Sequence, residues 1–141
     1  MGRIVAIDYG LKRVGLAVTD PLQIIATPLT TVPTADILNF LQNYAKQEAV
    51  EAFVVGLPKS LNNTASPLVS VIAKFVSVLQ KSFPAQQVFQ HDERYTSKLA
   101  LAGMVEGGFK KKDRRDKTNI DKLSATIILQ SFLTSHKRNV V

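Results

Sequence analysis

The chain has 141 residues, a formal net charge of +7, two histidines and no cysteine. The lack of cysteine excludes disulfides and thiolate zinc sites, and two histidines are too few for most imidazole-rich metal centres. A chain of this length can bury a hydrophobic core without disulfides or a structural metal, so a single domain over residues 1–141 is predicted. Its positive charge favours polyanionic partners.

The first part of the chain predicts three extended segments. An apolar, mostly β-branched run at Ile4–Ile7 ends at a turn that contains Gly10, and Val14–Val18 follows at hairpin distance. Asp20 and the proline after it then break the chain, and a third extended segment is expected over Ile24–Val32. Extended segments this close in sequence are typical of an antiparallel meander.

The rest of the chain alternates between helical and extended patterns. The expected elements are a helix from Thr34, a candidate cap, to Val50, a strand at Ala52–Leu57, a helix at Leu68–Leu79, a strand at Gln87–His91, a helix at Ser97–Val105 and a last helix over Ile120–Ser131. The order is β-β-β-α-β-α-β-α-α, and strands linked through helices should pair in parallel. The sequence therefore predicts a mixed-sheet α/β domain.

Three acidic residues are expected at one edge of this sheet. Asp8 ends the first strand, Glu93 follows the fifth, and Asp121 is expected in the first turn of the last helix. Ligand sites in open α/β sheets lie outside the carboxyl ends of the strands. Carboxylate oxygens suit Mg²⁺ or Mn²⁺, and two such ions roughly 4 Å apart can assist an in-line phosphoryl displacement. These acids are therefore the predicted catalytic and metal-binding residues.

Each acid also has an ordinary structural explanation. Asp8 could bond to the turn that follows it, and Glu93 could form an exposed pair with Arg94. Asp121 could share the capping of its helix with Thr118, three residues earlier. The expected convergence of the three carboxylates, rather than any one of them, favours a metal site.

The neighbours of Glu93 leave one choice open. Asp92 alternates with Glu93, so the two side chains should point in opposite directions, and Glu93 is the predicted ligand. A turn at this point could exchange the two. His91, at an apolar strand end, is expected to be a packed and hydrogen-bonded residue rather than a ligand.

A basic segment precedes the last helix. Six of eight residues there are positive, namely Lys110, Lys111, Lys112, Arg114, Arg115 and Lys117. Such a run cannot bury apolar surface and indicates a mobile loop that binds phosphate, although excess lysine can also serve solubility alone. Lys59 and the polar stretch Ser60–Thr64 are further candidate contacts, or a plain solvated turn. Aromatic residues are scarce in these segments, which favours recognition of the backbone over base stacking.

Four motifs, in this order, resemble the YqgF (RuvX) family. They are Ile7–Ala17, Val54–Pro58, Asp92–Ser97, and Ile120–Ala125 with Ile128 and Leu129 behind it. The resemblance implies a ribonuclease H-like α/β fold with a mixed five-stranded sheet of order 3-2-1-4-5 and helices on both faces. It also implies a bacterial, cytoplasmic nuclease of pre-16S ribosomal RNA that is related to Holliday junction resolvases.

The same resemblance assigns roles to individual residues. By motif it implies an acidic site of Asp8, Glu93 and Asp121, and contacts from Arg13 and Arg94 to the phosphate backbone. The chain departs from the family at Asn62 and Asn63, where Asp-Gly is usual, so this turn would rely on the tolerance of asparagine for the left-handed region. The basic loop is also longer and more charged than is usual in the family. This difference affects how the substrate is bound more than it affects the cleavage reaction.

The leading hypothesis is a metal-dependent nuclease that processes the 5′ end of pre-16S ribosomal RNA, with branched DNA as the alternative substrate. A monomer or weak homodimer is expected. A binding module without a metal site is a second hypothesis, although acids that face phosphate do not help a binder. A small actin-like ATPase shares the opening hairpin, but 141 residues leave no room for its second lobe. A cytoplasmic location is expected because no signal peptide or long apolar stretch is found.

Overall fold

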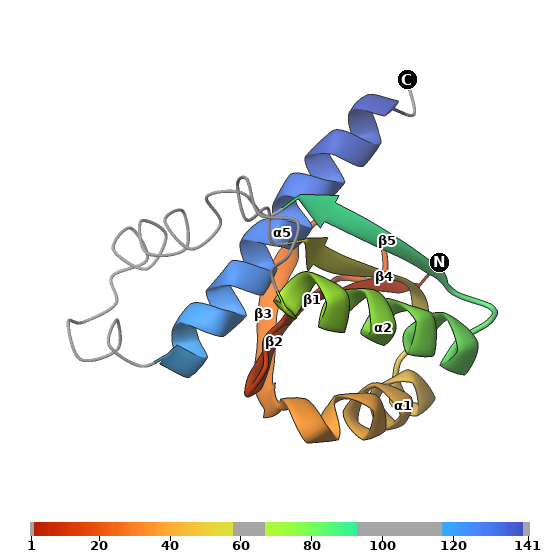
Figure 1. Ribbon diagram of the computed structural model, residues 1–141. Helices are drawn as coiled ribbons and strands as arrows, with labels where there is room; N and C mark the ends of the chain where they lie inside the picture. The colour runs from red at the N-terminus through yellow and green to blue at the C-terminus, as the bar shows by residue number, and fades with distance from the viewer. Residues whose placement is uncertain (1, 58–66, 93–116, 140–141) are drawn as a thin grey trace.

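The computed structural model describes residues 2–57, 67–92 and 117–139, and in them five strands form one mixed sheet (Figure 1). The strands are β1 (Arg3–Tyr9), β2 (Arg13–Thr19), β3 (Ala26–Pro33), β4 (Val50–Leu57) and β5 (Gln87–Asp92). β1, β2 and β3 form an antiparallel meander, whereas β4 pairs with β1 and β5 pairs with β4 in parallel. The strand order is β3-β2-β1-β4-β5, which confirms the predicted mixed sheet of order 3-2-1-4-5.

Helices cover both faces of the sheet (Figure 1). The described helical segments are η1 (Thr34–Asp36), α1 (Ile37–Gln47), α2 (Pro67–Ser82) and α5 (Lys117–Asn139). α1 and α2 pack on one face, and α5 packs on the other. The helix expected at Ser97–Val105 lies outside the described residues. Across the described parts of the chain, no helix combines the length and the apolar character that crossing a membrane would need.

Two expected helix starts are wrong. α5 begins at Lys117, so Asp121 lies in its second turn and not in its first, where the helix has no acidic residue. Thr34 does not cap α1: it opens a short 3₁₀ turn, and its hydroxyl donates to the Gly10 carbonyl at 2.7 Å. Its backbone amide donates to the Lys12 carbonyl at 3.0 Å. Thr34 therefore joins the end of β3 to the β1–β2 turn instead of starting a helix.

The alternation of side chains along β1 produces two hydrophobic cores. Val5 and Ile7 belong to the core under α1 and α2, whereas Ile4 and Ala6 belong to the core under α5. Tyr9 continues the first set and stacks on Phe75 of α2, with ring centroids 4.5 Å apart. Burial raises the pKa of the Tyr9 hydroxyl above its ordinary value. The side of each β1 residue is thus fixed by period-two geometry.

Gly15 of β2 lets α5 lie very close to the sheet. A Cβ atom at this position would fall inside van der Waals contact of the Asp121 carbonyl and 2.9 Å from the Asp121 Cβ. Real Cβ atoms do not approach backbone atoms this closely, so any larger residue would have to move the helix or the strand. Glycine at this point of β2 therefore sets the depth at which Asp121 sits.

The opposite end of the sheet is closed by the turn between β2 and β3, which is longer than expected. The Asp20 carboxylate accepts hydrogen bonds from the backbone amides of Leu22, Ile24 and Ile25 at 2.7–3.1 Å. Gln23 adopts a left-handed φ of 61° inside this turn. Since the turn uses residues through Ile25, β3 begins at Ala26 and not at Ile24.

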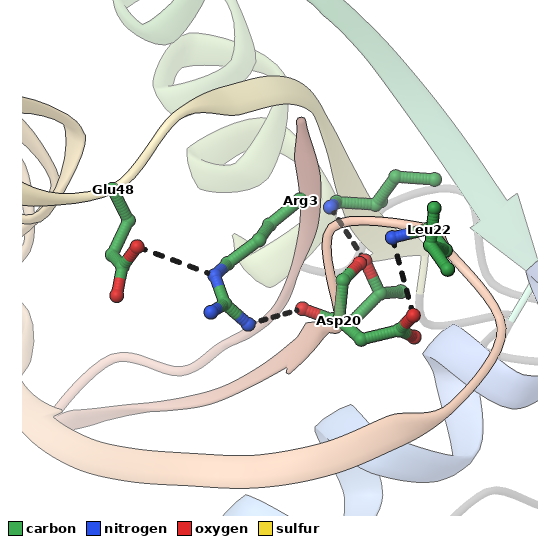
Figure 2. Close-up of polar contacts among 6 residues, drawn as sticks. Arg3, Asp20, Leu22 and Glu48 are labelled. Atoms are coloured by element: carbon green, nitrogen blue, oxygen red, sulfur yellow. Dashed lines mark hydrogen bonds and ion pairs between the residues drawn. The ribbon is translucent and has the colours of Figure 1, made fainter. Parts of the chain in front are cut away.

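Arg3 connects this turn to the C-terminal end of α1. Its guanidinium donates to the Thr19 carbonyl at 2.9 Å and lies 3.6 Å from a Glu48 carboxylate oxygen. Figure 2 shows Arg3 between Glu48 and the backbone beside Asp20. The buried Thr19 hydroxyl accepts from the Ile4 amide and donates to the Asp20 carbonyl. These bonds tie the first two strands to each other and to the end of α1.

We expect Gly15→Ala to lower the free energy of unfolding by roughly 2 kcal/mol or more, because its methyl group would overlap the Asp121 backbone. Urea denaturation of both proteins measures this difference. Leu11→Ala, at a turn position that is 64% exposed, is the control and should change stability little. A Gly15→Ala protein as stable as the parent would show that α5 can retreat from β2 without cost.

We expect the stability of the Asp20→Asn variant to depend less on pH than that of the parent. The hydrogen bond from the Ile25 amide, helped by those from Ile24 and Leu22, lowers the pKa of Asp20 below its ordinary value of 3.8. A lowered folded-state pKa stabilises the fold above the unfolded-state pKa, and this contribution disappears as pH falls through the folded-state value.

Urea denaturation between about pH 5 and the acid limit of the fold measures this difference. The parent should lose stability more steeply than Asp20→Asn as pH falls. Asp36→Asn is the matched control, because Asp36 is exposed and its side chain does not cap α1. Identical pH slopes for parent and Asp20→Asn would contradict the prediction.

Candidate active site

Asp8 lies at the carboxyl end of β1 on the side covered by α5. Ile4 and Ala6, which precede it at intervals of two, belong to the α5 core, and the intervening Ile7 belongs to the opposite core. The Tyr9 ring on Phe75 confirms that the next residue returns to the α2 side. Asp8 is partly exposed, so its carboxylate sits where the apolar core gives way to the sheet edge.

Asp121 meets Asp8 across Gly15. Asp8 and Gly15 are direct partners in the β1–β2 register, so both face the same side of the sheet. Cβ positions of directly opposed residues are about 5 Å apart, and the Asp121 Cβ lies 2.9 Å from the Cβ position of Gly15. The Cβ atoms of Asp8 and Asp121 are therefore at most roughly 8 Å apart. The structure brings these two predicted acids together, although Asp121 comes from the second turn of its helix.

Arg13 enters the same site from the start of β2. Its Nε donates to Oδ2 of Asp121 at 2.8 Å, and the Arg13 and Asp121 side chains are 36% and 22% exposed. Arg13 precedes Gly15 by two residues, so period-two geometry places it on the same side. At this exposure, solvent screening limits the pair to about 1 kcal/mol. Sequence reasoning did not predict this ion pair, and the phosphate contact expected of Arg13 stays a prediction.

The end of β5 is joined to α5 about 15 Å along the helix from Asp121. His91 Nε2 lies 2.8 Å from Ser131 Oγ, and the His91 ring meets Phe132 edge-on at a centroid distance of 6.1 Å. Phe89, two residues earlier, contacts Phe132 at 5.0 Å. His91 is thus hydrogen-bonded and in ring contact, as expected for it. Phe89 and His91 both face α5, so this side of β5 is the side on which Asp8 lies.

The remaining predicted site residues are not described by the structure. Glu93, Lys59, Arg94, Lys110, Lys111, Lys112, Arg114 and Arg115 lie outside the described residues, as does the turn Ser60–Thr64. Lys117 begins α5, but its side chain is not among those described. Within residues 2–57, 67–92 and 117–139, no three Asp, Glu, His or Cys side chains are grouped closely enough to bind a metal. Two of the three predicted acids are therefore placed together, and the position of the third stays a prediction.

The chemistry of the two described acids suits a hard divalent cation. Both are carboxylates at the partly exposed edge of the sheet, and Mg²⁺ prefers one or two carboxylates, with water and substrate phosphate completing its shell. One oxygen of Asp121 is already bonded to the Arg13 guanidinium. Any cation at this edge would therefore share Asp121 with Arg13 or take its place.

Solved structures share this fold. The structure of Thermus thermophilus RuvC in complex with a Holliday junction substrate matches with a TM-score of 0.58 and 19% identity, covering 97% of each chain. A second Thermus thermophilus RuvC structure matches with a TM-score of 0.51 over 96% of each chain. These likenesses, with the 3-2-1-4-5 sheet, confirm the predicted ribonuclease H-like fold.

Sequence relatives are much closer. A protein of Amoebophilus asiaticus named "Putative pre-16S rRNA nuclease" is 68% identical over the full length of both chains. A Bacteroides fragilis protein of the same name is 54% identical, over 97% of this chain and 99% of its own. The model of the RuvX family, described as Holliday junction resolvase, matches residues 2–135. This chain is therefore a member of the RuvX family.

Proposed function

We propose that this RuvX-family protein is a metal-dependent nuclease that processes the 5′ end of pre-16S ribosomal RNA. The observation that carries the proposal is the meeting of Asp8 and Asp121 across Gly15, at the edge of a ribonuclease H-like sheet. The names of the relatives, which cover nearly the whole chain, support the RNA substrate. The net charge of +7 supports a polyanionic one.

Glu93 is the proposed third acid. It follows β5 directly, two residues after His91, whose ring contacts α5 through Ser131 and Phe132. Strand periodicity supports Glu93 over Asp92 as the residue that shares the α5 side with Asp8. Three carboxylates from β1, from the residue after β5 and from α5 would then supply the oxygen ligands of two ions.

The chemistry proposed is hydrolysis of a phosphodiester bond. Bound Mg²⁺ or Mn²⁺ would stabilise charge on both the attacking and the leaving oxygen of an in-line displacement. Asp8 and Asp121 would hold oxygen ligands at a fixed spacing because both are attached to rigid elements that meet at Gly15. Arg13, on the same edge, would hold a non-bridging phosphate oxygen of the strand through its guanidinium. Water adds across the bond and leaves a phosphate monoester and a hydroxyl group.

The second candidate function is cleavage of branched DNA. Two observations favour it: the RuvX family model is described as a Holliday junction resolvase, and a structure of similar fold is of RuvC with a junction substrate. Symmetric cleavage of a four-way junction needs two sites related by a dimer axis, whereas trimming an RNA end needs one. A monomer or weak homodimer in the cytoplasm is the state proposed for RNA processing.

We expect Asp8→Asn, Glu93→Gln and Asp121→Asn each to reduce Mg²⁺- or Mn²⁺-dependent cleavage by roughly 100-fold or more. Nucleic-acid binding should stay the same or tighten, because each change removes a negative charge that faces phosphate. Cleavage of precursor 16S RNA and of a four-way DNA junction, measured side by side, tests the activity and chooses between the two substrates. Fluorescence anisotropy measures binding.

Asp36→Asn, purified in the same way, is the matched control and should cleave like the parent. Any acid variant that retains full activity removes that residue from the proposed site. If Asp8→Asn cleaves the substrates as fast as the parent does, the measured activity does not come from this site. If the parent cleaves neither substrate, the proposed function is wrong.

We expect neutralisation of Lys110, Lys111, Lys112, Arg114 and Arg115 to glutamine to weaken RNA binding and flatten its salt dependence. Each lost phosphate contact should reduce the slope of log K against log salt by about 0.7–0.9. Neutralising Lys46, Lys74 and Lys81, exposed on α1 and α2 at the other face, is the control for total charge. An equal loss of slope per neutralised charge in the two sets would show that net charge, and not the basic segment, drives binding.

A further inference from the structure

Arg13 places a positive charge inside the acidic edge of the sheet. Its Nε donates to Oδ2 of Asp121 at 2.8 Å, from a residue two positions before Gly15 on the same strand. Gly15 is the cross-strand partner of Asp8, so Arg13 lies on the side of the sheet that Asp8 also faces. A cation of the chain itself is therefore already bonded to one of the two acids with which the proposed function binds a divalent ion.

The geometry of this pair allows the guanidinium to leave. The Arg13 side chain is 36% exposed, so its head can turn to solvent without burying an unpaired charge. The contact that the structure gives to Asp121 is one Nε–Oδ2 bond and not the two-bond fork that fixes a guanidinium most firmly. Asp121 is less exposed, at 22%, and its position is fixed because α5 packs directly against Gly15. The carboxylate is the fixed partner and the guanidinium is the movable one.

We propose that Arg13 is an internal counter-cation that neutralises Asp121 until a divalent ion binds and displaces it from Oδ2. The displaced guanidinium stays on the same edge, where it is available to a phosphate group of the nucleic acid. The inference rests on the proposed function, because it requires that Asp8 and Asp121 bind metal. In this role Arg13 is a positioning residue that couples metal binding to substrate binding.

Electrostatics predicts the direction in which loss of the Arg13 charge changes the affinity for metal. A guanidinium within about 5 Å of a divalent ion repels it, and both compete for the same carboxylate oxygen. Loss of the Arg13 charge should therefore tighten metal binding. An arginine that only oriented Asp121 would act in the opposite direction, since loss of an outer hydrogen-bond partner typically weakens metal affinity by about 10–100-fold.

Calorimetric titration with MnCl₂ alone, without nucleic acid, tests the sign. We expect Arg13→Gln to bind Mn²⁺ on the order of tenfold more tightly than the parent. Arg13→Lys keeps the charge and should bind nearly as the parent does. Lys12→Gln removes the same charge from the exposed neighbouring residue and should change the affinity far less than Arg13→Gln, which controls for general electrostatics.

A second measurement follows thermal unfolding with and without Mn²⁺. Without metal, Arg13→Gln should melt below the parent, because the Asp121 carboxylate then loses its ion pair with the Arg13 guanidinium. Saturating Mn²⁺ should raise its melting temperature by more than it raises that of the parent. If the role of Arg13 were purely structural, Arg13→Gln would melt below the parent by the same amount with and without Mn²⁺.

The outcomes separate this inference from the proposed function. Unchanged or weaker Mn²⁺ binding by Arg13→Gln, with the parent binding normally, overturns the role of Arg13 and leaves the nuclease site intact. No Mn²⁺ binding by the parent overturns both. Arg13→Met is prepared in parallel, and if both neutral variants fail to fold by circular dichroism, Arg13 is a structural residue and the inference is wrong.

Discussion

The close seat of α5 on β2 at Gly15 is the constraint on which the candidate site depends. The missing side chain at this one position brings the Asp121 backbone down to the sheet, next to the strand neighbour of Asp8. A helix packed on larger strand side chains would hold its carboxylate further from the strand ends. The site is therefore set by a small residue that takes no part in its chemistry.

The two faces of the sheet differ in the size of the side chains that cover them. The face under α1 and α2 is built from large side chains such as Leu16, Phe53 and Leu79, all fully buried. The face under α5 uses Ala6 and Ala17 beside Gly15, so the helix can come near. Small residues reduce the apolar area buried per residue, and the large core on the other face offsets that loss. The larger apolar core therefore lies on one side of the sheet, and the close approach of a helix lies on the other.

The sequence predicted the five strands and the position of Asp8 because both follow from local patterns. Apolar runs and their spacing indicated the five strands, and the rule for strand ends placed Asp8 at a ligand edge. The partner of Arg13 could not be predicted in the same way. Arg13 and Asp121 are 108 positions apart, and their contact depends on the register of α5 against β2, which depends in turn on Gly15. A glycine in an otherwise apolar strand was the available signal, since it often marks a close backbone approach.

The two ends of the sheet use arginine in contrasting ways. Arg3 donates to the Thr19 carbonyl, a backbone group that cannot move without breaking the strand, and its side chain is 25% exposed. Arg13 binds a carboxylate at a more open edge, through a side chain that is 36% exposed. Arg3 also lies 3.6 Å from the Glu48 carboxylate, so it has two partners, whereas the structure gives Arg13 one bond to Asp121. A charge paired with a carboxylate at an open edge is exchangeable for any stronger cation, and so a basic protein can fold around its acids before it meets a metal.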